Sequence, residues 1–458
     1  MAIKISGSTI IDDSRVVVNS GNIGMGTADP HKPPAADNTK ILHTGIVTAN
    51  TYYGDGQYLT GAGFNPDDQY NLYAGTTAGT DSDADTCCNI GIGYSALHSN
   101  CAGDKNIALG ACAGTNVKAG GCNIFLGAYA GMAASDLSSL VNNVAIGLYA
   151  GACLENSYFN VMIGMQAGMK MSTGHRNILI GKFAGCEGPM TGQNNTYLGE
   201  YAGRCTTSGN DNIGLGRYSQ GTGVITGDNN ISMGCKAANN LTSGADNISL
   251  GRLSLGAAAV TGSYNIAFGF ESGCAVTSGA SHIFIGKYAG KATQTGQENT
   301  FIGLSAGSGA SQAHTGSKNI ALGSKAGYYG NSGSENIAIG NESGECVISG
   351  AEKNITIGTR AGYVINNAHE NIAVGSSAIG GDTATIGGCN IVMGLCAGWD
   401  IRSGHNNVAI GKDSLRMGAH TGNTNIAIGQ SAGYQNISGE CNIFVGRNAG
   451  ECLLSSGN

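Results

Sequence analysis

The sequence predicts an all-β fold: a parallel β-solenoid, or β-roll, of about 21 repeats of 17–18 residues, with a small extended N-terminal region. Three observations predict it. Glycine makes up 78 of the 458 residues while proline occurs five times, which excludes collagen. Hydrophobic residues make up 41% of the chain, enough for a core built from small units. The pattern Asn–apolar–x–apolar–Gly–x–x–Ala/Ser–Gly recurs from Asn89 onward, and such a period indicates a repeat architecture.

The repeat contains 21 units, and His282 takes the place of the asparagine once. The units are mostly 17 or 18 residues long, with 19 once and 20 twice. A glycine lies four residues after the asparagine in every unit, from Gly93 to Gly446. Because a tight corner commonly needs a backbone conformation that only glycine adopts easily, this glycine is expected to end a short strand.

Within a unit such as residues 106–110, two large apolar residues stand two apart. Alternate residues of a strand face the same side, so Ile107 and Leu109 share one face while Ala108 faces the other. Stacked units are then expected to bury a continuous column of Ile, Leu and Val.

The repeated asparagine is expected to form a structural ladder. Equivalent residues of a parallel sheet lie ~4.8 Å apart, so their amide side chains can hydrogen-bond from coil to coil. If one unit makes one coil, 21 coils give a rod on the order of 100 Å long; two units per larger turn would halve that length. We favour one unit per coil. The predicted ladder includes Asn106, Asn123, Asn177, Asn212, Asn247, Asn336, Asn371, Asn425 and Asn442.

The first part of the chain has a different composition, which predicts two regions. Residues 1–85 hold four of the five prolines and an alternating apolar stretch at 3–11, and are interpreted as an N-terminal attachment region with extended strands. Residues 86–458 form the solenoid shaft or head.

Charge and hydropathy exclude several classes of protein. The net charge of −7 provides no basic patch that would follow a phosphate backbone, so no nucleic acid partner is expected. The apolar runs are far shorter than the ~18–20 residues that span a bilayer, so no membrane insertion is expected. The first residues lack the apolar core of a signal peptide, which favours folding in a cytoplasm.

The 15 cysteines show no spacing typical of a zinc site. Most recur at set places of the repeat, and free thiols commonly pack as small buried hydrophobes. Reduced packing residues are therefore favoured over a disulfide framework. Cys186 and Cys205, in successive units, are the first pair to examine for a bond.

Two motifs resemble catalytic or metal-binding signatures. Ser305 and Ser431 lie in G-x-S-x-G segments, but the repeat frame itself produces this match whenever its third residue is serine. Asp81, Asp83 and Asp85 have the spacing that opens a calcium loop, without its later glycine and glutamate, and are interpreted as a solvated acidic linker. We expect no enzyme, no cofactor and no metal site.

One column of side chains suggests binding. Nine residues after the asparagine, alternate units of the C-terminal part carry an aromatic residue, and the units between them carry Glu345, Gly380 and Arg416. Aromatic faces beside polar groups are typical of sugar-binding surfaces. The same column could instead pack against a neighbouring subunit or fill a corner. The packing interpretation is favoured. The candidate glycan or receptor contacts are Tyr328, Tyr363, Trp399 and Tyr434.

The units at residues 336–344 and 425–433, with the pattern Asn-Ile-Ala-Ile-Gly-x-x-Ala/Ser-Gly, resemble the head repeat of trimeric adhesins. Those heads are left-handed β-rolls with three chains side by side, so the resemblance implies a homotrimer. This sequence departs from the adhesins in its longer unit and in showing no coiled-coil stalk, signal peptide or membrane anchor.

The N-terminal segments 1–15 and 53–61 resemble the opening segments of virion structural and tail-fibre-like proteins of marine cyanobacterial phages. Such a fibre is made in the host cytoplasm and typically attaches by its N-terminus while the rest projects. The resemblance implies other virion proteins as partners of this region.

The expected function is therefore a homotrimeric fibre or appendage of a virion that projects from the particle and contacts the host surface, with surface polysaccharide as the candidate ligand. The alternatives are an architectural or decorating virion protein with no receptor, and an exported adhesin at a bacterial cell surface.

Overall fold

The computed structural model of the chain describes residues 3–5, 8–11, 66–134, 138–309, 313–329, 332–348, 350–381 and 385–451. The chain forms two compact units, residues 1–60 and 61–458. In the first unit, β1 (Ile3–Ile5) and β2 (Ser8–Ile11) pair as an antiparallel hairpin, where the alternating apolar residues predict extended strands. The rest of the predicted attachment region, up to residue 65, lies outside the described residues.

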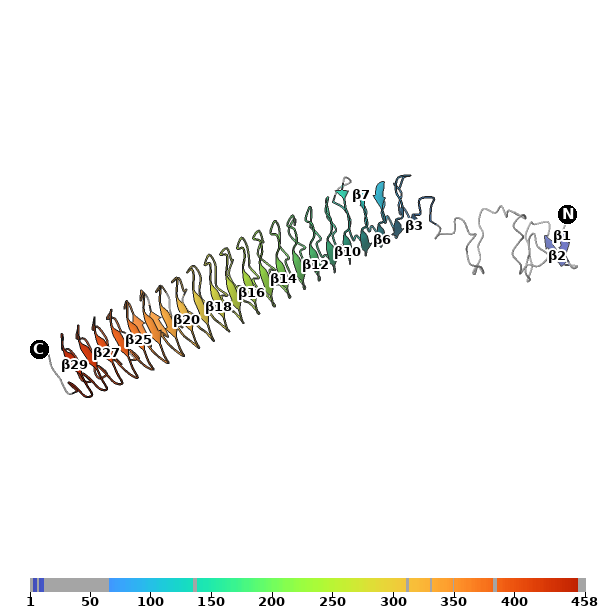
Figure 1. Cartoon of the computed structure of the whole chain (residues 1–458). Coiled ribbons are helices and arrows are strands. Elements are labelled where there is room, and N and C mark those ends of the chain that lie inside the picture. The colour runs from blue at the N-terminus through green and yellow to red at the C-terminus, as the bar shows by residue number, and fades with distance from the viewer. Residues whose placement is uncertain are drawn as a thin grey trace. The chain divides into compact units, whose positions relative to one another are not determined.

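The second unit is a parallel β-solenoid, in which each coil contributes one three-residue strand to a main sheet (Figure 1). The strands of this sheet are β3 (Leu72–Ala74), β4 (Ile90–Ile92), β6 (Ile107–Leu109), β8 (Ile124–Leu126), β10 (Val144–Ile146), β11 (Val161–Ile163), β12 (Ile178–Ile180), β13 (Thr196–Leu198), β14 (Ile213–Leu215), β15 (Ile231–Met233), β16 (Ile248–Leu250), β17 (Ile266–Phe268), β18 (Ile283–Ile285), β19 (Thr300–Ile302), β20 (Ile320–Leu322), β21 (Ile337–Ile339), β23 (Ile355–Ile357), β25 (Ile372–Val374), β26 (Ile391–Met393), β27 (Val408–Ile410), β28 (Ile426–Ile428) and β29 (Ile443–Val445).

Each strand of the main sheet pairs in register with the equivalent strand of the next coil. Ala145 of β10, for example, lies opposite Met162 of β11, 17 residues further along the chain. One unit therefore makes one coil, which confirms the favoured geometry. Within the described residues the main sheet stays open at both ends, since β3 pairs only with β4 and β29 only with β28.

The solenoid begins one coil earlier than the repeat count predicts. Asn71 opens a unit whose strand β3 pairs with β4, so the predicted boundary after residue 85 lies inside the solenoid. This unit keeps both glycines of the motif, Gly75 and Gly79, but has the small Ala74 where later units have a large apolar residue. The described residues therefore contain 22 coils, one more than the 21 counted from the sequence.

The other sides of the coils carry little sheet. A three-stranded sheet joins β5 (Ala102–Asp104), β7 (Val117–Gly121) and β9 (Ser138–Ser139), and a pair joins β22 (Cys346–Ile348) and β24 (Val364–Asn366). Single bridges such as Thr206 with Ile225 link some further coils on this side. The main sheet is thus the continuous element of the rod.

The strands face the opposite way from the prediction. The middle residue of each strand points into the solenoid, and the large apolar residues on either side of it point out: Ala108 is fully buried, while Leu109 is 39% exposed. The prediction that Ile, Leu and Val of the strands form the buried column is therefore wrong. The alternation itself fits either orientation, and the inward column holds large residues such as Phe125 and Met162 as well as alanine.

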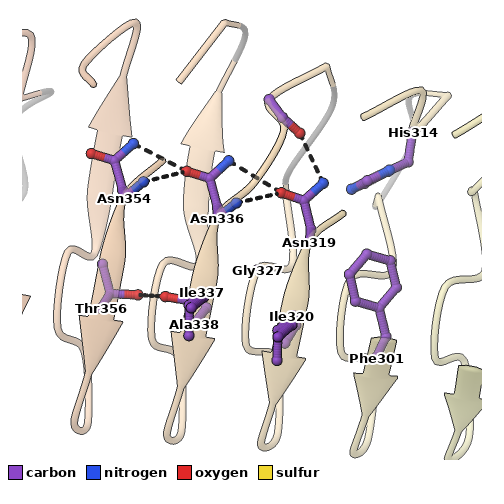
Figure 2. Close-up of a pocket in the computed structure, with 12 residues that line it drawn as sticks. Phe301, His314, Asn319, Ile320, Gly327, Asn336, Ile337, Ala338, Asn354 and Thr356 are labelled. Carbon is purple, nitrogen blue, oxygen red and sulfur yellow. Dashed lines mark hydrogen bonds between the residues drawn. The ribbon is translucent and has the colours of Figure 1, made fainter. Parts of the chain in front are cut away.

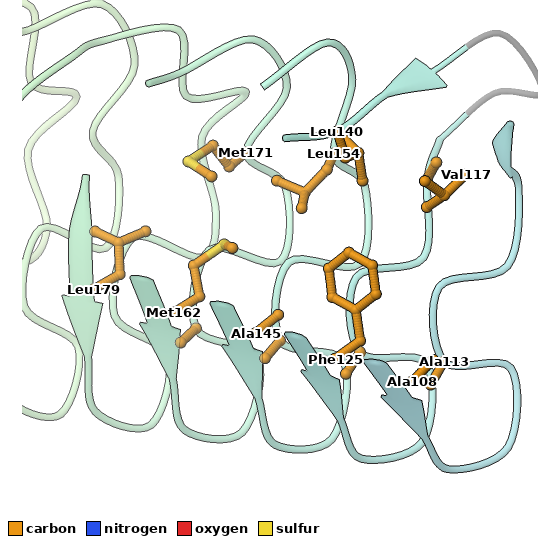
Figure 3. Packing of buried hydrophobic residues seen from close by; sticks show 14 of the residues in the cluster. Ala108, Ala113, Val117, Phe125, Leu140, Ala145, Leu154, Met162, Met171 and Leu179 are labelled. Carbon is orange, nitrogen blue, oxygen red and sulfur yellow. The ribbon is translucent and has the colours of Figure 1, made fainter. Parts of the chain in front are cut away.

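The core is built from three columns (Figure 3). The strands supply their middle residues, the corner after the strand supplies an alanine, and the third side supplies larger aliphatic residues. In the N-terminal third these are, respectively, Ala108, Phe125, Ala145, Met162 and Leu179; Ala113, Ala130, Ala150 and Ala167; and Val117, Leu140, Leu154 and Met171. Each column continues from coil to coil, so one coil buries its apolar surface only against its neighbours.

The glycine after each strand forms a corner that other residues cannot form without strain. Gly269 has φ +139°, and a Cβ there would lie 2.5 Å from the carbonyl oxygen of Gly286 in the next coil. The non-glycine residue two places later also has positive φ, as Tyr129 does with +57°. The corner therefore requires a glycine, which has no Cβ, and two places later a residue in the left-handed conformation whose side chain lies at the edge of the rod.

Candidate functional site

The asparagine ladder runs through the solenoid from Asn71 to Asn442. In a typical step, Oδ1 of Asn230 accepts hydrogen bonds from the backbone N–H and from Nδ2 of Asn247, both at 3.0 Å. Nδ2 of Asn247 also donates to the carbonyl of Gly262, at 3.0 Å. Of the predicted ladder residues, Asn106, Asn123, Asn177, Asn212, Asn247, Asn371 and Asn425 are buried, and Asn336 and Asn442 are partly exposed. This arrangement satisfies buried amides and holds consecutive coils in register.

His282 interrupts the ladder. Its backbone N–H donates to Oδ1 of Asn265 at 3.1 Å, and its Nδ1 accepts from the N–H of Asn299 at 3.2 Å. Because Nδ1 accepts, the buried ring is neutral with the proton on Nε2. Burial lowers the pKa of His282 to about 4, and burial likewise lowers the pKa of nearby His314 to about 4.

The predicted aromatic column lies on one edge of the C-terminal half. Tyr328, Tyr363, Trp399 and Tyr434 are all partly exposed, each separated from the next by one coil without an aromatic residue. Tyr328 contacts Tyr329 edge to face, and the guanidinium of Arg360 lies 4.1 Å from the centre of the Tyr363 ring. Glu345, between two of these coils, is 6% exposed, and burial raises the pKa of its carboxyl above the usual value. These rings do not stack on one another.

A second aromatic column, which sequence reasoning missed, lies six residues after the asparagine. The rings of Tyr129 and Tyr149 stack with centroids 4.7 Å apart. The rings of Phe183, Tyr201 and Tyr218 form a continuous stack with spacings of 4.9 and 4.7 Å. The signal was present, since these residues share one place of the repeat, but the stacking depends on the left-handed backbone of that place.

The outer face of the main sheet is a long apolar surface. Apart from Ala74, Thr196 and Thr300, the first and third residues of its strands form two parallel columns of Ile, Leu, Val, Met and Phe from coil to coil. Many of these side chains remain more than a third exposed, including Ile178, Ile180, Ile266 and Phe268 at 39%, 37%, 37% and 54%. Soluble monomers rarely expose a contiguous apolar patch larger than a few hundred Å². We call these two columns the apolar face.

The residues of the apparent catalytic motif lie on the corners. Ser305 and Ser431 are the left-handed residues of their coils, each with φ 56°. The backbone N–H of Ser305 donates to the carbonyl of Lys287 in the previous coil. Each segment continues into a turn and the next coil, where a nucleophile elbow would lead into a helix.

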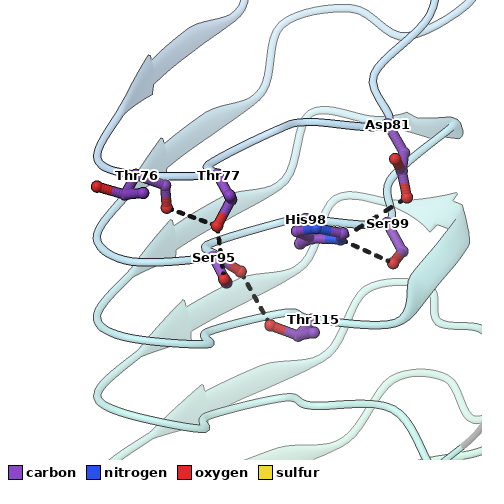
Figure 4. Close-up of polar contacts among 7 residues, drawn as sticks. All are labelled: Thr76, Thr77, Asp81, Ser95, His98, Ser99 and Thr115. Atoms are coloured by element: carbon purple, nitrogen blue, oxygen red, sulfur yellow. Dashed lines mark hydrogen bonds and ion pairs between the residues drawn. The ribbon is translucent and has the colours of Figure 1, made fainter.

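The acidic segment contacts the next coil (Figure 4). Oδ2 of Asp81 lies 3.7 Å from Nδ1 of His98, and the hydroxyls of Thr77 and Ser95 are 2.8 Å apart. Asp83 accepts a hydrogen bond from the backbone N–H of Asp85. In the described part of the chain, no group of three or more His, Cys, Asp or Glu side chains could hold a metal ion.

All cysteines of the described residues, which comprise every cysteine except Cys452, are free thiols. Cys186 is buried, which raises the pKa of its thiol to about 11, and Cys205 is partly exposed. Sγ of Cys205 lies 3.6 Å from Oε2 of Glu187, with which it can hydrogen-bond. The pair singled out from the sequence is therefore not bonded.

A cavity of about 30 Å³ lies in the core where several consecutive coils have small inward residues (Figure 2). Ala321, Ala338 and Thr356 follow one another in the column, and Phe301 and His314 bound the cavity on one side. The cavity lies against ladder residues Asn319, Asn336 and Asn354. Its lining has no nucleophile paired with a base, and we interpret it as a packing defect.

Comparison with known proteins finds no match to this chain among family models, curated proteins or solved structures. In the described residues, no helix is long and apolar enough to cross a membrane. The molecule is therefore defined by its fold, a β-solenoid with one unit per coil and an apolar face along its main sheet.

Proposed function

We propose that this protein is a structural fibre or appendage of a virion, built as a homotrimer whose chains meet through their apolar faces. Its N-terminal region attaches it to other virion proteins, and its solenoid projects towards the host surface. The protein is made in the host cytoplasm and resides in the particle. No catalytic role is part of the proposal.

The observation that carries the proposal is the apolar face. Its side chains repeat at every coil, so they would leave a stripe of exposed hydrocarbon along the whole rod if the chain stayed alone. A second and third copy present the same stripe with the same period, so identical chains match coil by coil. The resemblance of the repeat to trimeric adhesin heads favours three copies over two.

Sedimentation of the full chain tests the assembly. A trimer has three times the chain mass of 46.0 kDa. The double variant Ile266→Glu/Phe268→Glu places two carboxylates on the apolar face and is expected to shift the protein towards monomer. Tyr264→Glu, on an exposed residue outside this face, is the matched control and should leave the trimer intact. A monomeric wild-type chain, or equal effects of the two variants, would contradict the proposal.

The location rests on the likeness of segments 1–15 and 53–61 to virion proteins. Mass spectrometry of purified phage particles should detect the chain at a fixed ratio to the other structural proteins. Detection in a bacterial outer-membrane fraction, without particles, would favour the alternative of an exported adhesin.

Host attachment through the aromatic column is a further part of the proposal. Binding of the full chain to host cells or their surface polysaccharide should weaken in Tyr363→Ala/Trp399→Ala. Phe159→Ala/Tyr264→Ala removes two exposed rings elsewhere and serves as the control. Unchanged binding in the first variant would leave the purely architectural or decorating role.

A further inference from the structure

The place five residues after the ladder residue holds Lys412 and Arg447 near the C-terminus, and in the middle of the solenoid it holds exposed cationic side chains in four alternate coils. They are 35 residues apart in the sequence, which is two coils, and lie next to the corner glycine. With ~4.8 Å between coils, successive charges are about 10 Å apart along the rod. We call these residues the basic row: Lys182, Arg217, Arg252 and Lys287.

Aromatic rings support the basic row. Nζ of Lys182 lies 5.0 Å from the centre of the Phe183 ring, and the guanidinium of Arg217 lies 5.6 Å from that of Tyr218. Arg252 lies 4.3 Å from the Phe270 ring, and Lys287 lies 4.9 Å from the Tyr288 ring. Such contacts hold a cation in place without neutralising it, so its positive charge stays available to an anion.

Two cations near the basic row are neutralised by carboxylates, whereas the four side chains of the row are not. Arg204 forms an ion pair with Glu187, and Lys291 forms one with Glu271 at 2.8 Å. In the described residues, none of the four side chains of the basic row has a carboxylate within 4.0 Å. The basic row is therefore a regular series of exposed positive charges that are available to an anionic partner.

The coils between the four cations restrict the partner. Their equivalent places hold Glu200, Cys235 and Phe270, so a polymer with a negative charge at every coil would meet a carboxylate at Glu200. The rings of Phe183, Tyr201 and Tyr218 stack on one another, so both faces of Tyr201 and one face of each of the others are covered and cannot receive a base or a neutral sugar. Nucleic acid also fits poorly, because its charges follow at about 3.4 Å per strand.

We infer that the basic row binds an extended acidic polysaccharide that carries one anionic group for every two sugars. The charge period of such a polymer, one extended disaccharide, matches the two-coil period of the row. This site is distinct from the aromatic column at Tyr328, Tyr363, Trp399 and Tyr434. It lies within one chain, so it does not depend on the proposed trimer, although it must remain at the surface of the assembly.

Binding of the full chain to size-defined hyaluronan, which has one carboxylate per two sugars, tests the inference at low and moderate salt. Substituting the whole row, Lys182→Gln/Arg217→Gln/Arg252→Gln/Lys287→Gln, should weaken this binding about tenfold or more, because four exposed ion pairs are lost. The matched control changes four exposed cations that precede the ladder residues: Lys105→Gln/Arg176→Gln/Lys318→Gln/Lys353→Gln. It should change the affinity about twofold at most.

A second variant tests the spacing at constant charge. Lys287→Gln/Leu304→Lys moves the last cation by one coil, since Leu304 is 51% exposed and occupies the equivalent place of the next coil. Affinity for hyaluronan should fall about threefold or more, although the net charge is unchanged. Lys236, at the neighbouring place of one intervening coil, is retained in all variants.

Several outcomes would overturn the inference. These are equal losses in the row and control variants, an unaltered affinity in the spacing variant, and binding of polygalacturonate or single-stranded DNA as tight as that of hyaluronan. Dissociation of the assembly by the row variant, measured by sedimentation, would also overturn it, because the row would then be a contact between chains. Failure of the wild-type chain to form a trimer would contradict the proposed assembly and leave this inference standing.

Discussion

The ring of Phe125 occupies the space over the left-handed glycine Gly131 of the same coil, where a Cβ would collide with Cδ1 and Cε1 of the ring. The relationship is reciprocal along the rod. In the coil of Leu97, which lies eight residues after the asparagine as Gly131 does, the middle residue of the strand is the small Gly91. In the coil of Phe125 the two places share one volume, which the ring fills.

Gly131→Ala should therefore destabilise its coil more than Gly327→Ala does. Both positions have left-handed φ, +62° and +57°, so both substitutions cost about 1–2 kcal/mol of backbone energy. At Gly131 the new methyl group must also displace the Phe125 ring, which adds about 1–3 kcal/mol. At Gly327 the nearest atom is Cβ of Ala321 at 3.4 Å. Hydrogen exchange of the surrounding amides measures the local opening free energy. Equal changes in the two variants would refute the idea that residue 131 and the Phe125 ring share one volume.

Gly269→Val should disrupt its corner by more than about 1 kcal/mol. The new side chain would meet the carbonyl of Gly286 at 2.5 Å in addition to an unfavourable φ of +139°. Gly446, with φ +121° and no atom within 4 Å of a Cβ, is the matched site, where Gly446→Val bears the backbone cost alone. The comparison uses the melting temperature and local hydrogen exchange. An unchanged melting temperature in Gly269→Val would be inconsistent with the corner geometry.

The sequence predicts the period, the strand and the asparagine place because these are local patterns that repeat at one spacing. It does not predict which face is buried, because the alternation of Ile107, Ala108 and Leu109 is compatible with either face inward. Which face turns inward depends on how the whole coil closes, and the local pattern does not contain that information. The stack of Phe183 and Tyr201 was missed for a similar reason, since a left-handed backbone sets the direction of these rings.

Acid should weaken the coils around His282 before the rest of the ladder. The pKa of His282 falls from 6.5 in the unfolded chain to about 4 in the fold, so the unfolded state binds more protons between these values. The associated stability is present above about pH 6.5 and is lost as the pH falls towards 4. Protonation also removes the acceptor for the N–H of Asn299.

His282→Asn restores the regular ladder residue and should reduce this acid sensitivity. Part of the acid sensitivity should remain, because burial also lowers the pKa of His314. Hydrogen exchange of residues 265–309 at pH 7 and pH 5 is the measurement, with the exposed His369→Asn as control. Equal pH dependence in wild type and His282→Asn would rule out His282 as the sensitive group.

Filling the cavity should stabilise the rod. Ala338→Val adds two methyl groups beside the space between Ala321 and Thr356 and is expected to gain about 0.5–2 kcal/mol locally. The matched change Ala145→Val lies between the larger residues Phe125 and Met162 and is expected to lose about 1–3 kcal/mol. Hydrogen exchange of the surrounding amides at increasing denaturant concentration measures the local stability of each variant and distinguishes the two. Destabilisation of both variants alike would indicate that the cavity collapses without cost.

The register between coils has a mechanical consequence. The hydrogen bonds of the main sheet join successive coils and therefore point along the rod, with three-residue strands at each interface. Tension between the two ends of the solenoid acts on these interfaces in series, so each must bear the whole force and the weakest yields first. The rod resists compression better than tension, and under a steady pull a single chain lengthens by whole coils, mostly in steps of 17 or 18 residues.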